Sequence, residues 1–358
     1  MELDDLGWTP ALSFAFEPFV RTCRPARVSA VHGHQYQILT GEAERRAVVS
    51  GRVRASADEA GAVGLPTVGD WVAFEAIGAD QAVIRAVLPR ATYLVRKAAG
   101  RTSEAQALAA NVDFVLIVMG LDGDFNLRRL ERALALVHQG GAVPVVVLNK
   151  SDLATGAAEA RREEVVRVAR TAAVHSLSAL HGDGVAGLVP YLARGRTLAL
   201  LGSSGAGKST LLNRLMGGDW QPTREVRAHD SRGRHTTTSR QIFVLPSGAL
   251  LIDTPGIREI PLVGDDQDLG AVFDEITALA TDCRFRDCRH GGEPGCAVRR
   301  AVDEGALEPA RLQSLRKLEA ERAYQGVRED SGLARERKAQ WKTIHKAARQ
   351  RQRLKRGE

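Results

Sequence analysis

The chain has 358 residues, 44% of them hydrophobic, and a formal net charge of +7 at pH 7. This length allows two or three domains. No apolar run reaches the about 20 residues that a membrane-spanning helix needs, and the acidic start of the chain is unlike a secretory signal, so we expect no membrane partner. Three of the four cysteines lie close together, which favours metal binding over disulfides and predicts a cytoplasmic protein. The basic balance favours a polyanionic partner.

Residues 1–26 carry scattered aromatic side chains and two prolines, and we expect them to form a short arm packed on the adjoining domain. Residues 27–90 predict an all-β domain, because short β-rich runs alternate there with glycines and polar residues. The expected strands are 27–32, 35–40, 47–54, 70–75 and 82–88. Five short strands in a segment of this length predict a small barrel of the OB type.

Barrels of this type often bind single-stranded nucleic acid through basic grooves and stacking aromatic rings. Here the charge would come from Arg45, Arg46, Arg52 and Arg54, and Tyr36 would stack on a base. The alternative is a barrel that only docks onto the next domain. The sequence leaves both interpretations open.

Residues 91–260 alternate strands and helices. The apolar runs at 113–119, 143–148, 174–177 and 197–201 are typical of parallel strands covered on both faces, and residues 127–138 have helical spacing. Two further strands are expected at 241–245 and 250–253. The pattern predicts a doubly wound parallel sheet that binds a nucleotide at the carboxyl ends of its strands.

A guanine-binding motif follows the second of these strands. Asn149, Lys150, Ser151 and Asp152 match N-K-x-D. Asp152 would accept hydrogen bonds from N1 and the exocyclic amine of guanine, Lys150 would pack along the base, and Asn149 would hold the loop. After the third strand, Ser178 and Ala179 begin an element similar to S-A-K, in which Leu180 replaces the usual lysine.

A phosphate loop of the form G-x-x-x-x-G-K-[ST] follows the fourth strand and opens into a helix, which is the context that separates a true loop from a chance match. Its backbone N–H groups would point at phosphate oxygens. Lys208 would reach the outer phosphates, and the Ser209 hydroxyl would ligate Mg²⁺. The residues expected around the phosphates are Gly202, Ser203, Ser204, Gly205, Ala206, Gly207, Lys208, Ser209 and Thr210.

Two switch segments complete the predicted site. Asp253 begins a D-x-x-G motif, in which it would hold Mg²⁺ through water and the Gly256 N–H would meet the γ-phosphate. Residues 233–238 are the expected first switch, where Thr236 or Thr237 would supply a second Mg²⁺ hydroxyl.

The water-positioning group that Ras-like enzymes place after D-x-x-G is absent, because that position holds Ile257 instead of glutamine. We therefore expect slow hydrolysis by the isolated protein. His235 is the nearest candidate to position the water, and the alternative is that it caps the switch loop.

The order of these motifs is unusual. In a Ras-like domain the phosphate loop comes first, whereas here N-K-x-D and S-A-x precede it. The same sheet can still form, because the termini of compact domains lie close together and tolerate permutation. The order therefore predicts a circularly permuted GTPase that binds GTP and GDP.

A cluster of metal-binding residues lies after the sheet: Cys283, Cys288, His290 and Cys296. Three thiolates and one imidazole form a closed tetrahedral set, which is typical of structural Zn²⁺. We expect one zinc ion per chain. Residues 301–325 have helical apolar spacing, and the chain beyond 332 is rich in Arg and Lys, which predicts either RNA contact or a solvated tail.

These features divide the chain into an arm (1–26), a barrel (27–90), a permuted GTPase domain (91–260), a zinc-binding, mostly helical domain (261–325) and a basic tail (326–358). Together the barrel, the permuted GTPase and the Cys₃His segment resemble the ribosome small subunit-dependent GTPase family, RsgA. Residues 66–71, Pro-Thr-Val-Gly-Asp-Trp, also resemble the barrel signature of that family. The resemblance covers about residues 27–325.

The resemblance implies a slow GTPase that is stimulated by the 30S subunit and acts late in its maturation, with 16S rRNA and small-subunit assembly factors as partners. We expect a monomer. One alternative is a nucleotide-gated RNA-binding module in which hydrolysis is incidental. Another is a GTPase that serves tRNA or membrane partners, which the lack of an apolar anchor disfavours.

Overall fold

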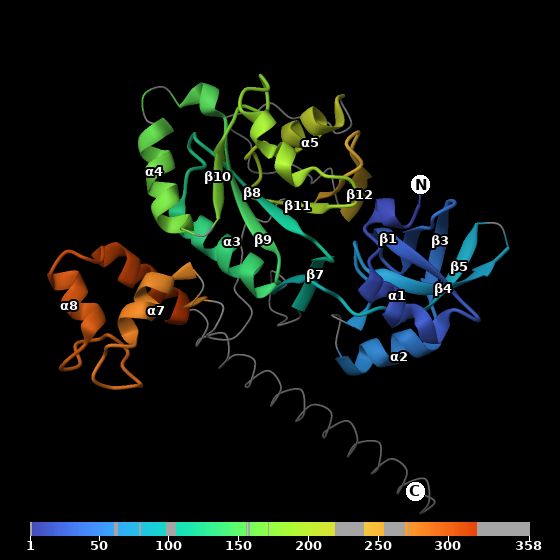
Figure 1. Cartoon of the computed structure of the whole chain (residues 1–358), viewed down its shortest axis with the longest axis horizontal. Coiled ribbons are helices and arrows are strands. Elements are labelled where there is room, and N and C mark those ends of the chain that lie inside the picture. The colour runs from blue at the N-terminus through green and yellow to red at the C-terminus, as the bar shows by residue number, and fades with distance from the viewer. Residues whose placement is uncertain are drawn as a thin grey trace, which may run out of the picture. The chain divides into compact units, whose positions relative to one another are not determined.

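The computed structural model describes residues 2–60, 64–78, 80–97, 105–154, 156, 158–170, 172–218, 240–253, 269–270 and 272–320. The chain forms two compact units (Figure 1). The first unit comprises Met1–Lys97 and Glu104–Asp274, and the second comprises Ala98–Ser103 and Glu275–Glu358. Among the described residues, none of the helices is long and apolar enough to cross a lipid bilayer.

The first unit begins with a closed five-stranded barrel, as the sequence predicted. Its strands are β1 (Arg24–His32), β2 (Gln35–Leu39), β3 (Glu44–Val49), β4 (Trp71–Ile77) and β5 (Gln81–Val87). They lie in the order β1-β2-β3-β5-β4, and β4 pairs with β1 to close the barrel. Alternate residues point inward, as the two-residue period of a strand requires. The barrel core includes Val28, Ile38, Phe74 and Ile84.

Tyr36 belongs to this core, which corrects the sequence analysis. Its side chain is 2% exposed and packs with Ile38, two residues further along β2. A ring on the inward face of a strand cannot stack on a base outside the barrel, so the proposed stacking role is wrong. The available signal was the alternation of Gln35 and Gln37 with Tyr36 and Ile38, which places the ring on the apolar face of the strand.

A helix that the sequence analysis missed lies between β3 and β4. The expected strand 47–54 ends at Val49, and α2 (Gly51–Ala60) comes after it. The Ser50 Oγ accepts a hydrogen bond from the Val53 N–H at 3.3 Å, as an N-cap does. Val53 and Ala57 are buried one helical turn apart. The cap and this spacing were the available signals.

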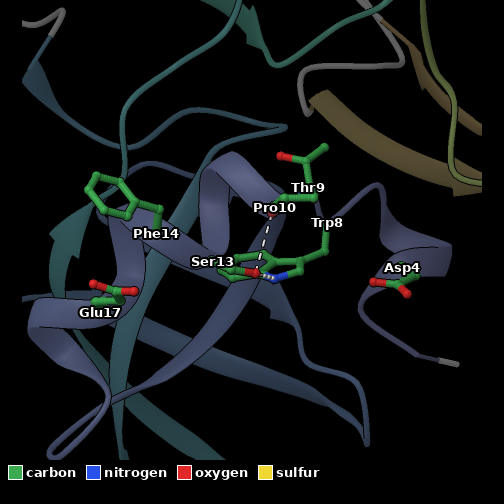
Figure 2. A pocket seen from close by; sticks show the side chains of 7 residues that line it. All are labelled: Asp4, Trp8, Thr9, Pro10, Ser13, Phe14 and Glu17. Carbon is green, nitrogen blue, oxygen red and sulfur yellow. Dashed lines mark hydrogen bonds between the residues drawn. The ribbon is translucent and has the colours of Figure 1, made fainter.

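The N-terminal arm packs against the barrel. It consists of the short helices η1 (Asp4–Leu6), α1 (Pro10–Phe16) and η2 (Glu17–Phe19). The Trp8 ring meets Trp71 of β4 edge-on, with 4.8 Å between centroids. The Trp8 indole N–H donates to the Ser13 Oγ at 2.8 Å, and these side chains line a shallow hollow on the arm (Figure 2).

The remainder of the first unit is an α/β domain. Its strands are β8 (Phe114–Gly120), β9 (Val143–Asn149), β10 (Ala173–Ser176), β11 (Thr197–Leu201), β12 (Arg240–Val244) and β13 (Leu250–Asp253). They form the order β10-β9-β8-β11-β13-β12, and Figure 1 shows β8 to β11 side by side. All neighbours are parallel except β12, which runs antiparallel to β13 because a tight turn joins the two. The parallel sheet that we expected is therefore found for five strands, and β12 corrects it as an antiparallel strand.

Three helices connect these strands: α3 (Leu127–Gln139), α4 (Ala158–Ala169) and α5 (Lys208–Met216). Shorter 3₁₀ helices, η4 (Ser151–Leu153) and η5 (Val185–Tyr191), follow β9 and β10. The hairpin of β6 (Tyr93–Lys97) and β7 (Ala105–Ala110) was not predicted. The Tyr93 N–H donates to the Gly140 carbonyl at 2.8 Å, so the hairpin is fixed to the end of α3.

A buried arginine joins the arm, the barrel and the α/β domain. The Arg27 side chain of β1 is 1% exposed and donates to the carbonyls of Leu6, Gly69 (3.2 Å) and Asn111 (2.9 Å). Burial lowers the pKa of Arg27 to about 10, against the raising effect of Asp113 and Asp70, so the group stays charged at neutral pH. Beside it, β1 pairs with β12, which makes the barrel and the α/β sheet continuous.

The second unit contains α7 (Asp274–Ala280) from its second residue on, α8 (Ala297–Asp303) and a further helix over residues 309–320. The helix expected over 301–325 is interrupted, because Gly305 adopts a left-handed φ of +75° and Pro309 starts a new helix. Four leucines at 307, 312, 315 and 318 are buried. The Arg311 guanidinium pairs with Glu275 at 2.7 Å.

Replacing the central arginine tests how much this junction stabilises the first unit. Arg27→Met keeps the length of the side chain but removes the donor to the Leu6 and Asn111 carbonyls, whereas the Gly69 carbonyl still accepts from the Asn111 Nδ2 at 3.1 Å. The free energy of unfolding should therefore fall by about 2–4 kcal/mol. Arg24→Met is the matched control, because Arg24 lies on the same strand with its side chain 66% exposed. Urea denaturation measures both variants. Equal midpoints would contradict the role given to Arg27.

Candidate functional site

A glycine-rich loop joins β11 to α5, as the sequence predicted, and its glycines are needed for close contacts. Gly205 and Gly207 have left-handed φ values of +87° and +94°. A Cβ on Gly207 would lie 2.1 Å from the Asn149 Nδ2, and one on Gly202 would lie 2.3 Å from the Val118 carbonyl oxygen. Any larger residue would push the loop away from the strands beneath it.

Lys208 is the buried cation of this loop. Its side chain donates from Nζ to the carbonyl oxygens of Gly202 at 2.9 Å and Ser203 at 2.7 Å. Burial lowers the pKa of Lys208, and the charges of Asp253 and Asp124 oppose this shift. A buried cation that is bonded only to neutral carbonyls interacts strongly with an incoming anion. Ser209 and Thr210 are half-buried in the first turn of α5, and Ser204 is exposed.

Asn149 connects this loop to the predicted guanine motif. Its amide Nδ2 donates to the Ala206 carbonyl at 2.9 Å, and its Oδ1 accepts from the Ala179 N–H at 2.9 Å. The residue ends β9 and is 2% exposed. One side chain thus holds three segments together: the end of β9, the loop after β10 and the phosphate loop.

The predicted base-binding residues surround this bridge. Lys150 has a left-handed φ of 63° and precedes η4, on which Asp152 lies with its side chain 21% exposed. The Asp152 Oδ2 lies 3.8 Å from the His181 Nε2. Ser178 is buried, and its Oγ accepts from the His181 N–H at 3.2 Å. The structure therefore brings both predicted base-binding segments to one place.

Arg214 of α5 supports the loop in which Leu180 replaces the usual lysine. Its guanidinium donates to the carbonyls of Ala179, at 3.1 Å, and Leu180. The Leu180 side chain itself is 63% exposed. The substitution therefore leaves the backbone of this loop well supported.

The metal-binding side of the site is described in part. Asp253 ends β13 and is 7% exposed, beside Leu200 of the parallel strand β11. Strands β9, β11 and β13 therefore all deliver predicted site residues at their carboxyl ends, as expected for this architecture. The predicted residues Thr236, Thr237, His235 and Gly256, together with Ile257, lie outside the described residues.

Two acidic residues of the site were missed by the sequence analysis. Asp122 and Asp124 come directly after β8, and each contacts one of the predicted motifs. Polar residues directly after a parallel strand were the signal that could have found them, because they lie on the same edge of the sheet as the motifs after β9 and β11.

The sheet order shows the permutation. Strand β11 carries the phosphate loop and lies between β8 and β13, although β9 and β10, which carry the base-binding segments, come before it in the chain. The residues needed for a complete nucleotide site therefore meet in space in spite of their order in the sequence.

The second unit holds the predicted metal cluster. The ligand atoms of Cys283, Cys288, His290 and Cys296 all lie within 4.8 Å of one another. The His290 Nδ1 lies 3.7 Å from the Cys283 sulfur and 3.5 Å from the Cys296 sulfur, and the two sulfurs are 3.9 Å apart. Around tetrahedral zinc, with Zn–S of about 2.3 Å and Zn–N of about 2.0 Å, ligand atoms lie roughly 3.5–3.8 Å apart. The residues present fit a metal ion.

The thiols themselves also favour a cation. Partial burial and the neighbouring thiols of Cys296 and Cys283 raise the pKa of Cys288 to about 11, against the lowering effect of a backbone hydrogen bond at His290. Three thiolates this close together repel one another, and a bound divalent ion removes that repulsion. The cluster could therefore hold one metal ion.

Comparison with known proteins points in the same direction. The family model described as RsgA GTPase matches residues 87–263. A protein of Opitutus terrae named "Small ribosomal subunit biogenesis GTPase RsgA" is 49% identical, and the alignment covers 99% of each chain. The chain belongs to the RsgA GTPase family. A relative of the same name from Syntrophotalea carbinolica is 42% identical over 96% of both chains.

Solved structures agree with this membership in the RsgA family. The crystal structure of YjeQ from Thermotoga maritima has a TM-score of 0.62 and 26% identity, covering 83% of this chain and 97% of that one. The structure of YloQ, described as a circularly permuted GTPase, has a TM-score of 0.60 at 21% identity, covers 86% of this chain and 96% of that one, and supports the fold.

A family model for ABC transporters also matches residues 187–351, a span that includes the phosphate loop. The predictions of a permuted GTPase and of this family are confirmed.

Removing one thiol tests the metal cluster. We expect one metal ion per chain in protein purified without chelator, and loss of that ion in Cys296→Ser, because a three-ligand site binds far more weakly. Cys23→Ser is the matched control, since Cys23 is the cysteine outside the cluster. Elemental analysis of both variants measures the metal directly. Full metal content in Cys296→Ser would contradict the assignment.

Proposed function

We propose that the protein hydrolyses GTP to assist the maturation of the small ribosomal subunit. The observation that carries this proposal is the Asn149 bridge, which joins the phosphate loop and both predicted base-binding segments into one site. The relatives named above as small ribosomal subunit biogenesis GTPases support the choice of partner.

Base recognition would rest on Asp152 and Lys150 of the motif and on the loop at Ser178 and Ala179, all beside the bridge. Asp152 would accept from N1 and the exocyclic amine of guanine, a pattern that adenine cannot offer. Lys150 would pack along the base, with Ser151 between them in the motif. The loop at Ser178 and Ala179 would contact the guanine oxygen through its backbone, which Asn149 and Arg214 hold in place.

The phosphate loop would bind the triphosphate with its N–H groups, and Lys208 would exchange its two carbonyl partners for phosphate oxygens. Magnesium, when bound with GTP, would neutralise developing charge on the phosphates. Ser209 would hold it directly and Asp253 through water, with Thr236 or Thr237 as a further hydroxyl. The Gly256 N–H would meet the γ-phosphate.

Basal hydrolysis would be slow, because Ile257 cannot orient a water molecule. His235, or a group that the ribosome contributes, would supply this function. The metal of the second unit would be zinc with a structural role, because Cys₃His leaves no open ligand position.

The partners would be the 30S subunit, its 16S rRNA and assembly factors bound to it, and the place of action the cytoplasm, with the protein acting as a monomer. The net charge of +7 supports an RNA surface. On the barrel, Arg46, Arg52 and Arg54 are exposed and available to phosphates. The proposed domains are the five segments expected from the sequence, from the arm to the basic tail that begins at residue 326.

A change of base specificity tests the guanine assignment. Asp152→Asn should weaken GTP binding by about tenfold to a hundredfold, because a charge-assisted pair of hydrogen bonds is lost. The same variant should bind xanthosine triphosphate better than the wild type does, since an amide can donate to the C2 carbonyl of xanthine. Competition with a fluorescent nucleotide measures both affinities. An unchanged preference for GTP would refute the role of Asp152.

The ribosomal partner is tested by GTP turnover with and without purified 30S subunits. We expect slow basal turnover, strong stimulation by 30S subunits, and about a hundredfold or greater loss of stimulated turnover in Lys208→Ala. Large subunits prepared from the same ribosomes serve as the control. Turnover that 30S subunits do not change would favour the alternative of an RNA-binding module in which hydrolysis is incidental.

A further inference from the structure

The short loop after β8 contacts both halves of the nucleotide site. It covers residues 121–126 and leads into α3, whose first turn is capped by the Asn126 side chain through the Arg129 N–H at 3.0 Å. The Leu121 N–H donates to the Asn149 carbonyl at 2.8 Å, so the loop is attached directly to the end of β9. None of the nucleotide-binding motifs found in the sequence includes this loop.

Asp122 pairs with the lysine of the predicted guanine motif. The Lys150 Nζ donates to the Asp122 Oδ2 at 2.7 Å, and the Asp122 Oδ1 accepts from the Asp124 N–H at 3.1 Å. Burial alone would raise the pKa of Asp122, but the hydrogen bonds from Lys150 and the Asp124 N–H hold that pKa below its ordinary value. The carboxylate is therefore charged at neutral pH and fixes the end of the lysine side chain.

Gly120 makes this pairing sterically feasible. A Cβ on Gly120 would lie 2.4 Å from the Asp122 Oδ1, which is far closer than any real Cβ contact. The carboxylate folds back over the end of β8 because nothing projects from that position. A methyl group at residue 120 would therefore displace the Asp122 carboxylate without altering its chemistry.

Asp124 binds the phosphate loop through the hydroxyl of Ser203. Ser203 is the first residue after the leading glycine of that loop, and its Oγ donates to the Asp124 carboxylate with 2.6 Å to each oxygen. Ser203 is 6% exposed. Arg129 pairs with the Asp124 Oδ1 at 2.8 Å, so the negative charge next to the phosphate position is compensated. This compensation limits repulsion between Asp124 and a bound phosphate.

From these contacts we propose that Asp122 and Asp124 are positioning residues of the nucleotide site. Asp122 holds Lys150 in the extended form that lies along the guanine base, and Asp124 holds Ser203 so that the phosphate loop keeps its wrapped shape. The inference rests on the proposed function, because both aspartates act through residues assigned there to GTP. Preorganisation of this kind raises affinity by lowering the entropy lost on binding.

Double-mutant cycles test the pairs separately. The variants are Asp122→Ala with Lys150→Met, and Asp124→Ala with Ser203→Ala, and the probe is a fluorescent GDP analogue whose Kd is measured at equilibrium. Each single change should raise Kd by about tenfold, the equivalent of one charge-assisted hydrogen bond. Within each pair the second change should add less than about twofold, because the interaction is already lost. Glu163→Ala on α4 is the matched control, a carboxylate outside the site.

A second route displaces Asp122 without removing it. Gly120→Ala should raise the Kd for GDP in the wild-type background and have little further effect in Asp122→Ala. In Asp122→Ala, the single-turnover rate at saturating GTP should change less than about twofold, because Lys150 contacts the base and not the reacting phosphate. A purely structural role would instead lower the midpoint of thermal unfolding and leave the Kd of the folded fraction unchanged.

GDP binding by the wild-type protein distinguishes failure of the proposed function from failure of this inference. Wild-type protein that does not bind GDP overturns the proposed function itself. Wild-type protein that binds GDP, with Asp122→Ala and Asp124→Ala binding as tightly as Glu163→Ala, overturns this inference alone. Additive losses within each pair overturn it as well, because they show that the aspartates do not act through Lys150 and Ser203.

Discussion

The nucleotide site depends on one amide side chain. Asn149 uses both ends of its amide, one toward the phosphate loop at Ala206 and one toward the loop at Ala179. The bridge matters for the permuted chain, because the base-binding segments come before the phosphate loop in the sequence. Its two hydrogen bonds hold these separate segments next to that loop. Its burial strengthens both hydrogen bonds and makes an unsatisfied partner costly. The close approach of Gly207 to the same amide leaves no room for a side chain at position 207.

The barrel is connected to the nucleotide site through strand β12. Strand β12 pairs with β1 of the barrel on one side and with β13, which ends at Asp253, on the other. Arg27 adds a buried charge that three carbonyls from separate segments share. The RNA-binding surface proposed for the barrel is thus connected by backbone hydrogen bonds to a strand next to the proposed Mg²⁺ position. A ribosomal partner bound to the barrel would therefore be connected through β1, β12 and β13 to the position proposed for the γ-phosphate.

The segment around the metal cluster has little apolar content with which to stabilise itself. Between Cys283 and Cys296 the sequence has a single large apolar side chain, Phe285, and it is 41% exposed, so a bound ion would supply much of the cohesion there. The leucines at 307, 312, 315 and 318 provide the apolar part of the same unit. The metal ion and the leucine core would therefore stabilise neighbouring parts of one small unit. Neither part is large enough to fold without the other.

The sequence by itself determined the motifs, the approximate strands and the permutation, because each depends on residues close together in the chain. It also indicated the Cys₃His set from spacing alone. Only the tertiary structure decided which side chains face inward, as with Tyr36, and which distant residues meet, as with Asn149 and Ala206, which are 57 positions apart. The position of Asp122 and Asp124 after β8 indicates the site but not their partners, and Arg27 carries no local signature of its role. Their partners are set by how strands align at one edge of the sheet, and alignment is a property of packing that no short stretch of sequence contains.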